Sequence, residues 1–236
     1  MLLFLGSLQE IVTARRRAAG GGGGGTASFV TSRDGFGSLG SSTVAVTFSP
    51  NLTAGNYIIC TVFWGAAVTI SSVQDGTSAS FTAIDTDNTN RTATYRLAST
   101  AGGASASTIT VTFSAADSGD NPTLLCQQWN DSGGTFTLDV HKTNRQAGSV
   151  AGTNTVTTGN VTTTGKDGCM ATAETVGQSN GGFSAGTDIA WVDRHNPGQN
   201  FILQESFVQS GAGAIAGTFS ATAGSDMRTT IVCLKP

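Results

Sequence analysis

The amino-acid sequence predicts an all-β protein folded as an antiparallel two-sheet β-sandwich. Threonine, serine and glycine dominate it, with 36, 24 and 32 residues in a chain of 236. All three are poor helix formers, and threonine favours strands. Charged residues make up only 11% of the chain, against a usual figure of about 25%. From Thr26 onward, short runs of apolar and polar residues are interrupted by Gly, Asn, Asp and Ser, which indicates strands joined by turns.

Residues 1–19 are predicted to form a short amphipathic helix that docks onto a partner. Apolar residues recur there at helical spacing, and a run of three arginines follows them. A secretory signal would carry its positive charge before the apolar stretch, and the apolar run is far shorter than the ~20 residues that span a bilayer. The expected docking residues are Leu2, Phe4, Leu5, Leu8, Ile11, Val12, Arg15, Arg16 and Arg17.

Six glycines at positions 20–25 follow this segment and are interpreted as a flexible tether. The β-sandwich domain is then expected to occupy residues 26–236. Because an isolated helix of this length is marginal in water, its apolar face needs a partner. We expect other structural proteins of the same assembly, or sister copies in a homo-oligomer, to supply it.

The strands of the body are predicted from short apolar runs, some alternating and some continuous, each ended by turn residues. In 43–49 and 108–114 every second residue is apolar, so Val44, Val46 and Phe48 are expected to face a core and the intervening threonines to face outward. The predicted strands are 27–33, 43–49, 57–64, 68–74, 80–85, 92–98, 108–114, 123–129, 136–141, 160–164, 168–176, 188–192, 201–209, 214–221 and 228–234.

One sequence pattern recurs along the chain. The run Ser42-Thr-Val-Ala-Val-Thr-Phe-Ser49 returns 65 residues later as Ser107-Thr-Ile-Thr-Val-Thr-Phe-Ser114, and more weakly at 214–220. Trp64 and Trp129 are separated by the same 65 residues. Two interpretations stay open: the hairpins are duplicated, or the strands have similar sequences because they pack in the same way.

Three local patterns resemble a known family. A V-x-V-T-F strand is followed by Ala54-Gly55-Asn56-Tyr57 entering an apolar strand, and then by Val73-Gln74-Asp75-Gly76 leading to Phe81-Thr82. This succession resembles the jelly-roll or immunoglobulin-like β-sandwich modules of bacteriophage virion accessory proteins and of bacterial surface proteins. The resemblance covers about residues 26–236. It implies a structural, displayed or adhesive role and supplies no catalytic residues.

The four cysteines, Cys60, Cys126, Cys169 and Cys233, each lie inside an apolar run, without a CxxC or Cys/His cluster. We interpret them as small buried thiols. Two disulfides, with three possible connectivities, remain the alternative in an oxidising compartment.

Two sets of residues are candidates for ligand binding. Asp85, Asp87 and Asn90 cluster oxygen atoms that could hold calcium, although the closing glutamate of a calcium loop is missing. Trp191 and Tyr95 could form an exposed aromatic face for a glycan, whereas Trp64 and Trp129 are expected in the core. No other metal or cofactor is expected.

Enzyme motifs occur only in the wrong context. Ser179 and Ser184 each stand in a G-x-S-x-G pattern, followed by Asp188 and His195, but a nucleophile elbow requires a strand-to-helix turn. Asp139 and Asp193 each precede a histidine by two residues, which places both side chains on one face of a strand. We expect surface hydrogen bonds there and no enzymatic activity.

The sequence therefore favours a non-enzymatic structural protein located on a virion or an extracellular surface, such as a virion decoration, fibre or tail accessory protein anchored by residues 1–19. The alternative is a secreted carbohydrate-binding or adhesin module. Nucleic acid is not an expected partner, because a net charge of −3 comes with no basic stripe along the body.

Overall fold

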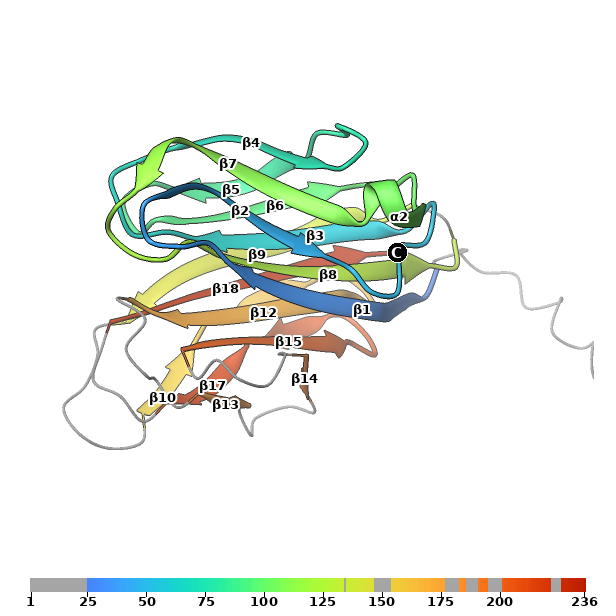
Figure 1. Ribbon diagram of the computed structural model, residues 1–236. Helices are drawn as coiled ribbons and strands as arrows, with labels where there is room; N and C mark the ends of the chain where they lie inside the picture. The colour runs from blue at the N-terminus through green and yellow to red at the C-terminus, as the bar shows by residue number, and fades with distance from the viewer. Residues whose placement is uncertain are drawn as a thin grey trace, which may run out of the picture.

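The computed structural model describes residues 25–133, 135–146, 154–176, 183–185, 191–194, 201–221 and 226–236. The all-β prediction is confirmed: the described residues form antiparallel strands and a single helical turn, α2 (Gly103–Ala106) (Figure 1). The predicted helix at 1–19 lies outside the described residues.

The first half of the chain forms one sandwich, here called the first sandwich. Its strands are β1 (Ala27–Phe36), β2 (Ser41–Thr47), β3 (Tyr57–Phe63), β4 (Ile70–Asp75), β5 (Thr82–Asp87), β6 (Thr92–Leu97), β7 (Thr108–Asp117) and β8 (Thr123–Asp131). One sheet has the order β1-β8-β3-β6-β5, and the other has the order β2-β7-β4.

The second half forms the second sandwich. Its strands are β9 (Thr137–Gln146), β10 (Asn154–Thr157), β11 (Val161–Thr163), β12 (Gly168–Thr175), β13 (Ser184–Ala185), β14 (Val192–Asp193), β15 (Ile202–Val208), β16 (Gly213–Ile215), β17 (Thr218–Ala221) and β18 (Met227–Lys235). Its five-stranded sheet has the order β14-β15-β12-β18-β9, and two smaller sheets pair β10-β17-β13 and β11-β16.

The two sandwiches have the same topology. Read from its other edge, the second five-stranded sheet has the order β9-β18-β12-β15-β14. In this order, its strands correspond one to one to β1-β8-β3-β6-β5 of the first sandwich. The remaining strands correspond too: β13 matches β4, the pair β10 and β11 matches β2, and the pair β16 and β17 matches β7. The chain is therefore a tandem of two like sandwiches.

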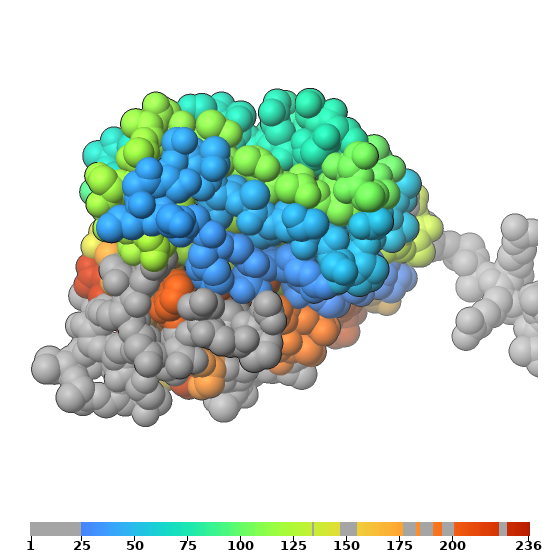
Figure 2. Space-filling view, viewed as in Figure 1, coloured from blue at the N-terminus to red at the C-terminus, as the bar shows by residue number. Residues whose placement is uncertain are grey.

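The sheets stack in four layers around three cores, with the two five-stranded sheets facing each other in the middle (Figure 1). The first core lies inside the first sandwich and the second core inside the second sandwich. The third core lies between the two five-stranded sheets, and it joins the sandwiches. Its buried side chains are Ala27, Tyr57, Ile59, Phe63, Leu125, Trp129, Phe136, Met170, Ile202, Val232 and Leu234. In the space-filling view the first sandwich, blue to green, lies directly against the orange strands of the second (Figure 2).

This stacking explains which strands alternate and which are apolar throughout. In β2, Val44 and Val46 are buried and the residues between them are exposed, because only one face of that sheet meets a core. β3 and β12 are buried along their whole lengths, because they lie in the middle layers and both of their faces are covered. The prediction of two sheets was wrong: the strands form five sheets.

The sequence pattern that recurs after 65 residues is explained by where its two copies lie in the fold. Ser42–Ser49 and Ser107–Ser114 cover β2 and β7, which pair with each other; Val44 lies opposite Val111, and Val46 lies opposite Ile109. They are neighbouring strands of one sheet and not duplicated hairpins. The weaker echo at 214–220 falls on β16 and β17, which correspond to β7 in the second sandwich.

Candidate functional site

The boundary between the two sandwiches holds a buried ion pair. Glu174 on β12 and Arg228 on β18 lie opposite each other and form a salt bridge, with their side chains 1% and 2% exposed. The Arg228 guanidinium also crosses the boundary, where it donates hydrogen bonds to the backbone oxygens of Trp64 at 2.6 Å, Arg91 at 3.1 Å and Asn90 at 3.2 Å. These contacts anchor the second sandwich to two turns of the first.

Burial raises the pKa of Glu174 above its usual value, although the charge of Arg228 opposes the rise. Truncating one member of such a buried pair leaves the other charge uncompensated, which typically costs about 3–5 kcal/mol. The ion pair therefore holds the two sandwiches in one relative placement. Neither Glu174 nor Arg228 lines either of the two cavities described below.

Neutral polar side chains continue the contact along the same boundary. Gln127 of the first sandwich donates to the Gln204 side chain at 3.3 Å and to the Glu205 backbone oxygen at 3.1 Å. Thr61 is hydrogen-bonded to Thr230 across the boundary at 3.3 Å. Because hydrogen bonds need defined geometry, these contacts fix one orientation of the sandwiches where an apolar surface alone would allow sliding.

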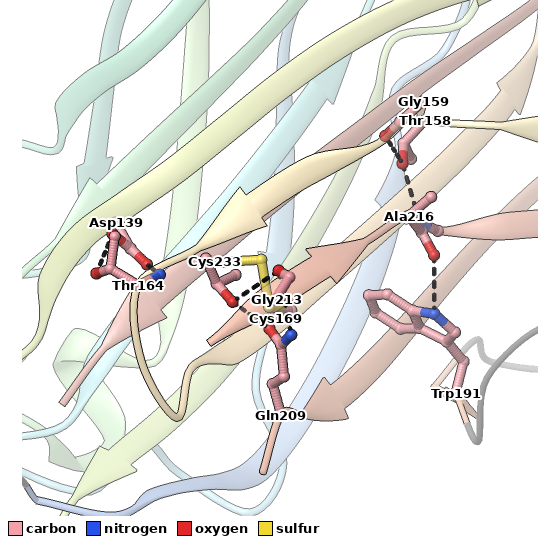
Figure 3. Close-up of a disulfide and its surroundings, with 12 residues drawn as sticks. Asp139, Thr158, Gly159, Thr164, Cys169, Trp191, Gln209, Gly213, Ala216 and Cys233 are labelled. Carbon is pink, nitrogen blue, oxygen red and sulfur yellow. Dashed lines mark hydrogen bonds between the residues drawn. A yellow bond between two sulfur atoms is a disulfide. The ribbon is translucent and has the colours of Figure 1, made fainter. Parts of the chain in front are cut away.

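A second polar cluster, here called the carboxyl pair, consists of Asp139 on β9 and Asp167 in the loop before β12. Asp139 is the extra residue of a β-bulge, because Leu138 pairs with Leu234 and Val140 pairs with Cys233. Its carboxylate accepts hydrogen bonds from the Thr164 backbone N–H at 2.5 Å and from the Thr164 hydroxyl at 2.8 Å (Figure 3).

Asp167 is fully buried, and its carboxyl group lies beside that of Asp139. Burial, the largest cause, and the neighbouring Asp139 carboxylate together raise its pKa to about 7, while the Lys235 ammonium opposes the rise. Burial alone would raise the pKa of Asp139, but hydrogen bonds from Thr164 and Asp167 hold it below its usual value. The pair can therefore share one proton near neutral pH.

Paired carboxyl groups with separated pKa values can serve as acid and base in catalysis. Neither of the two cavities described below is lined by Asp139 or Asp167. The pair is a place where the folded protein can hold a proton. It was not predicted, because a bulge and a loop bring together two residues that are 28 positions apart in the sequence.

The predicted aromatic face does not exist as one exposed surface. Trp191 is 7% exposed and belongs to the second core, where it packs on Phe207 with ring centroids 5.6 Å apart and donates to the Ala216 backbone oxygen at 3.1 Å (Figure 3). Tyr95 is 9% exposed and belongs to the first core. The prediction failed because Trp191, which stands between Asp188 and Asp193 in the sequence, is covered by Phe207 and by the segment around Ala216.

Tyr95 nevertheless borders a cavity at the open side of the first sandwich, between β4 and β5. The cavity has a volume of about 270 Å³. Its lining residues are Ile70, Ser71, Ser72, Val73, Ser80, Phe81, Ala83 and Tyr95. A second cavity of about 420 Å³ lies where β5 and β6 meet the start of β9, and it contains Arg96 and Phe136.

The three calcium candidates are occupied by hydrogen bonds to one another and to β9. Asp87 accepts from the Asn90 backbone N–H at 2.8 Å and from the Asn90 side-chain amide at 2.6 Å. Asp85 accepts from the Thr143 hydroxyl at 2.9 Å. Asn90 thus turns a donor towards Asp87, so these oxygens cap a turn and link β5 to β9. Over the described ranges, no group of three or more His, Cys, Asp or Glu side chains is placed to hold a metal ion.

Two of the four cysteines are joined. Cys169 on β12 and Cys233 on β18 form a disulfide inside the second core (Figure 3). The prediction of buried free thiols was wrong for this pair, whereas Cys60 and Cys126 are free and buried as predicted. The sequence could not decide this, because pairing depends on which strands lie side by side.

The remaining candidates are only partly described. Ser184 lies in the short strand β13 opposite Ser220, and it therefore does not stand on a nucleophile elbow. Ser179, Asp188 and His195 fall outside the described residues, as do the docking residues at positions 2–17. In the described part of the chain, no helix is long and apolar enough to cross a membrane.

Comparison with known proteins identifies no family. No family model matches the chain, and no curated protein matches it. Among solved structures, one match is titled "Crystal Structure of the STIV MCP"; it is 6% identical, covers 89% of this chain and 96% of that chain, and has a TM-score of 0.32. A likeness at that level does not transfer a function.

Proposed function

We propose that this chain is a non-enzymatic structural protein of a virion, such as a decoration, fibre or tail accessory protein, anchored to its assembly by residues 1–19. The body, residues 26–236, would be the displayed block, and the N-terminal segment would carry the contact with other structural proteins or sister copies.

The observation that carries this proposal is how little apolar surface the body offers to a partner. Its described residues bury their apolar side chains in three cores. The large hydrophobic side chains that stay exposed among those residues are Val30, Leu39, Val192 and Val208. Stable protein interfaces have an apolar, well-packed centre. The amphipathic segment at 1–19 is the part of the sequence with the composition to supply one.

The attachment point of the segment supports the same role. Gly25 lies so close to the end of β8 and the turn after it that a side chain there would collide with the Asp131 carboxylate and the Gly133 backbone. The Thr26 backbone N–H donates to the Ser132 hydroxyl at 2.9 Å. The last glycine of the run is therefore held against the body, so a pull on the N-terminal segment would act directly on the edge of a five-stranded sheet.

The proposal is tested on the full chain by light scattering. A Leu5→Asp/Leu8→Asp variant places two charges on the apolar face of the segment, and we expect it to lose the oligomers formed by the wild type. Gln9→Glu/Thr13→Asp adds the same charge at polar positions and should assemble normally.

Equal masses for the wild type and the Leu5→Asp/Leu8→Asp variant, both oligomeric, would contradict docking through this segment. A monomeric wild type would exclude the homo-oligomer and restrict the proposal to docking on a foreign partner. The secreted carbohydrate-binding alternative has less support, because Trp191 and Tyr95 lie in separate cores.

A further inference from the structure

The free cysteines of the first sandwich occupy the places of the disulfide in the second. Cys169 lies on β12 and Cys233 on β18, and these strands correspond to β3 and β8. Cys60 lies on β3 and Cys126 on β8. Both pairs point into the inner core of their own sandwich. The two cysteine pairs are therefore topologically equivalent.

The register of the first sandwich also suits a bond between them. Cys60 and Cys126 are direct partners across the β3–β8 ladder, as Cys169 and Cys233 are across the β12–β18 ladder. Directly opposite residues of an antiparallel pair have Cα atoms about 4.5–5.5 Å apart, and disulfides commonly span about 4.4–6.8 Å. The bonded pair, with a Cα–Cα distance of 4.2 Å, lies just below both ranges.

The environment of the free pair determines when such a bond can form. Both thiols are fully buried. Burial raises the pKa of Cys126 well above its ordinary value, and contact with Cys60 and the charge of Asp34 raise it further. Since the thiolate is the attacking species and both thiols are buried, we expect oxidation in the closed native state to be slow and the bond to form while the sheet is still open during folding.

We propose that Cys60 and Cys126 are a second cross-strand disulfide site, equivalent in position to Cys169 and Cys233 and oxidised by a small-molecule disulfide. The thiolate of one cysteine attacks a sulfur of the oxidant and releases one molecule of reduced thiol. The thiolate of the other cysteine then attacks the mixed disulfide at the protein sulfur, forms the Sγ–Sγ bond and releases the second reduced thiol. Two protein thiols are oxidised, and one disulfide is reduced to two thiols.

The proposal is tested on the full chain, refolded from the reduced and denatured state with oxidised glutathione. Thiols left after refolding are alkylated under denaturing conditions and counted by intact mass, and the linked peptides are mapped. We expect no alkylated cysteine, with Cys60 joined to Cys126 and Cys169 joined to Cys233. Oxidation should raise the melting temperature above that of a sample in which only Cys169 and Cys233 are linked, by about 10 °C.

The mapping needs no variant, so failure of a variant to fold cannot decide the question. Cys126→Ser provides a matched control: it should show one alkylated thiol, at Cys60, with the Cys169–Cys233 bond intact. Two alkylated thiols at Cys60 and Cys126 in the refolded wild type would overturn the proposal. A bond that joins either of them to Cys169 or Cys233 would overturn it equally.

Discussion

At the scale of single residues, the carboxyl pair is the feature with the clearest physical consequence. Asp167 has an ordinary pKa of 3.8 as a model compound and about 7 in the folded protein. Between these values the folded protein keeps a proton that the unfolded chain has released. Stability therefore decreases as pH rises through that window, and the protein is expected to be more stable at mildly acidic pH than at pH 8.

Replacing Asp167 by asparagine should remove the part of this dependence that Asp167 contributes, while the raised pKa of Glu174 leaves its own part in place. The amide cannot ionise, and it offers a donor to the Asp139 carboxylate. A shift of this size corresponds to at most about 4 kcal/mol; solvent screening beside the loop reduces it, so we expect Asp167→Asn to be about 2 kcal/mol more stable than the wild type at pH 8 and close to it at pH 5. Urea unfolding at both pH values measures the difference, and an unchanged slope of stability against pH would contradict the shared proton.

Single residues also show where a sequence pattern is enough to predict burial. The burial of Val44 and Val46 was predicted from alternation alone, since the period of a strand is local. The burial of Trp191 was not, because its contacts come from Phe207 on β15 and from Ala216 between β16 and β17, which follow it in the sequence by 16 and 25 positions. The ion pair of Arg228 and Glu174 was not predicted for the same reason. The partner of a charged residue in an apolar run can be identified only when the pairing of the strands is known.

At the scale of elements, the contact between the sandwiches depends on how closely β12 approaches β8. Gly168 opens β12, and a Cβ atom there would lie 2.7 Å from Cζ3 and 2.8 Å from Cε3 of Trp129. Trp129 is fully buried in the third core. The glycine thus allows the strand to lie directly against the indole ring.

A Gly168→Ala variant should therefore be destabilised by about 2 kcal/mol, because the added methyl group overpacks a filled core. Gly211→Ala is the matched control, since no heavy atom lies within 4 Å of its Cβ position and its effect should be near zero. Urea midpoints compare the two variants. Equal stability of both would show that the indole ring can move away and that the approach of β12 is not tight.

Most strands were predicted within a few residues, because alternation and turn residues act locally. The number of sheets was not, because the apolar pattern of β3 and β12 shows that both faces are covered without showing what covers them. Strand β10 (Asn154–Thr157) was not predicted, because it carries one apolar residue, Val156. It is a strand because it pairs with β17.

At the scale of the whole molecule, the central claim is that two like sandwiches form one block. The third core, the Arg228 contacts and the Gln127 and Thr61 hydrogen bonds all cross their boundary. A boundary this apolar and this specifically paired resembles the interior of one domain more than the interface of two mobile ones. The block would then hold its shape while the N-terminal segment provides attachment.

The measurement that tests this most directly is scanning calorimetry of the full chain. If residues 26–236 form one cooperative unit, heating should give a single transition whose calorimetric and van't Hoff enthalpies agree. Two separate transitions, one for each sandwich, would contradict the account, since they would show that one sandwich unfolds while the other stays folded.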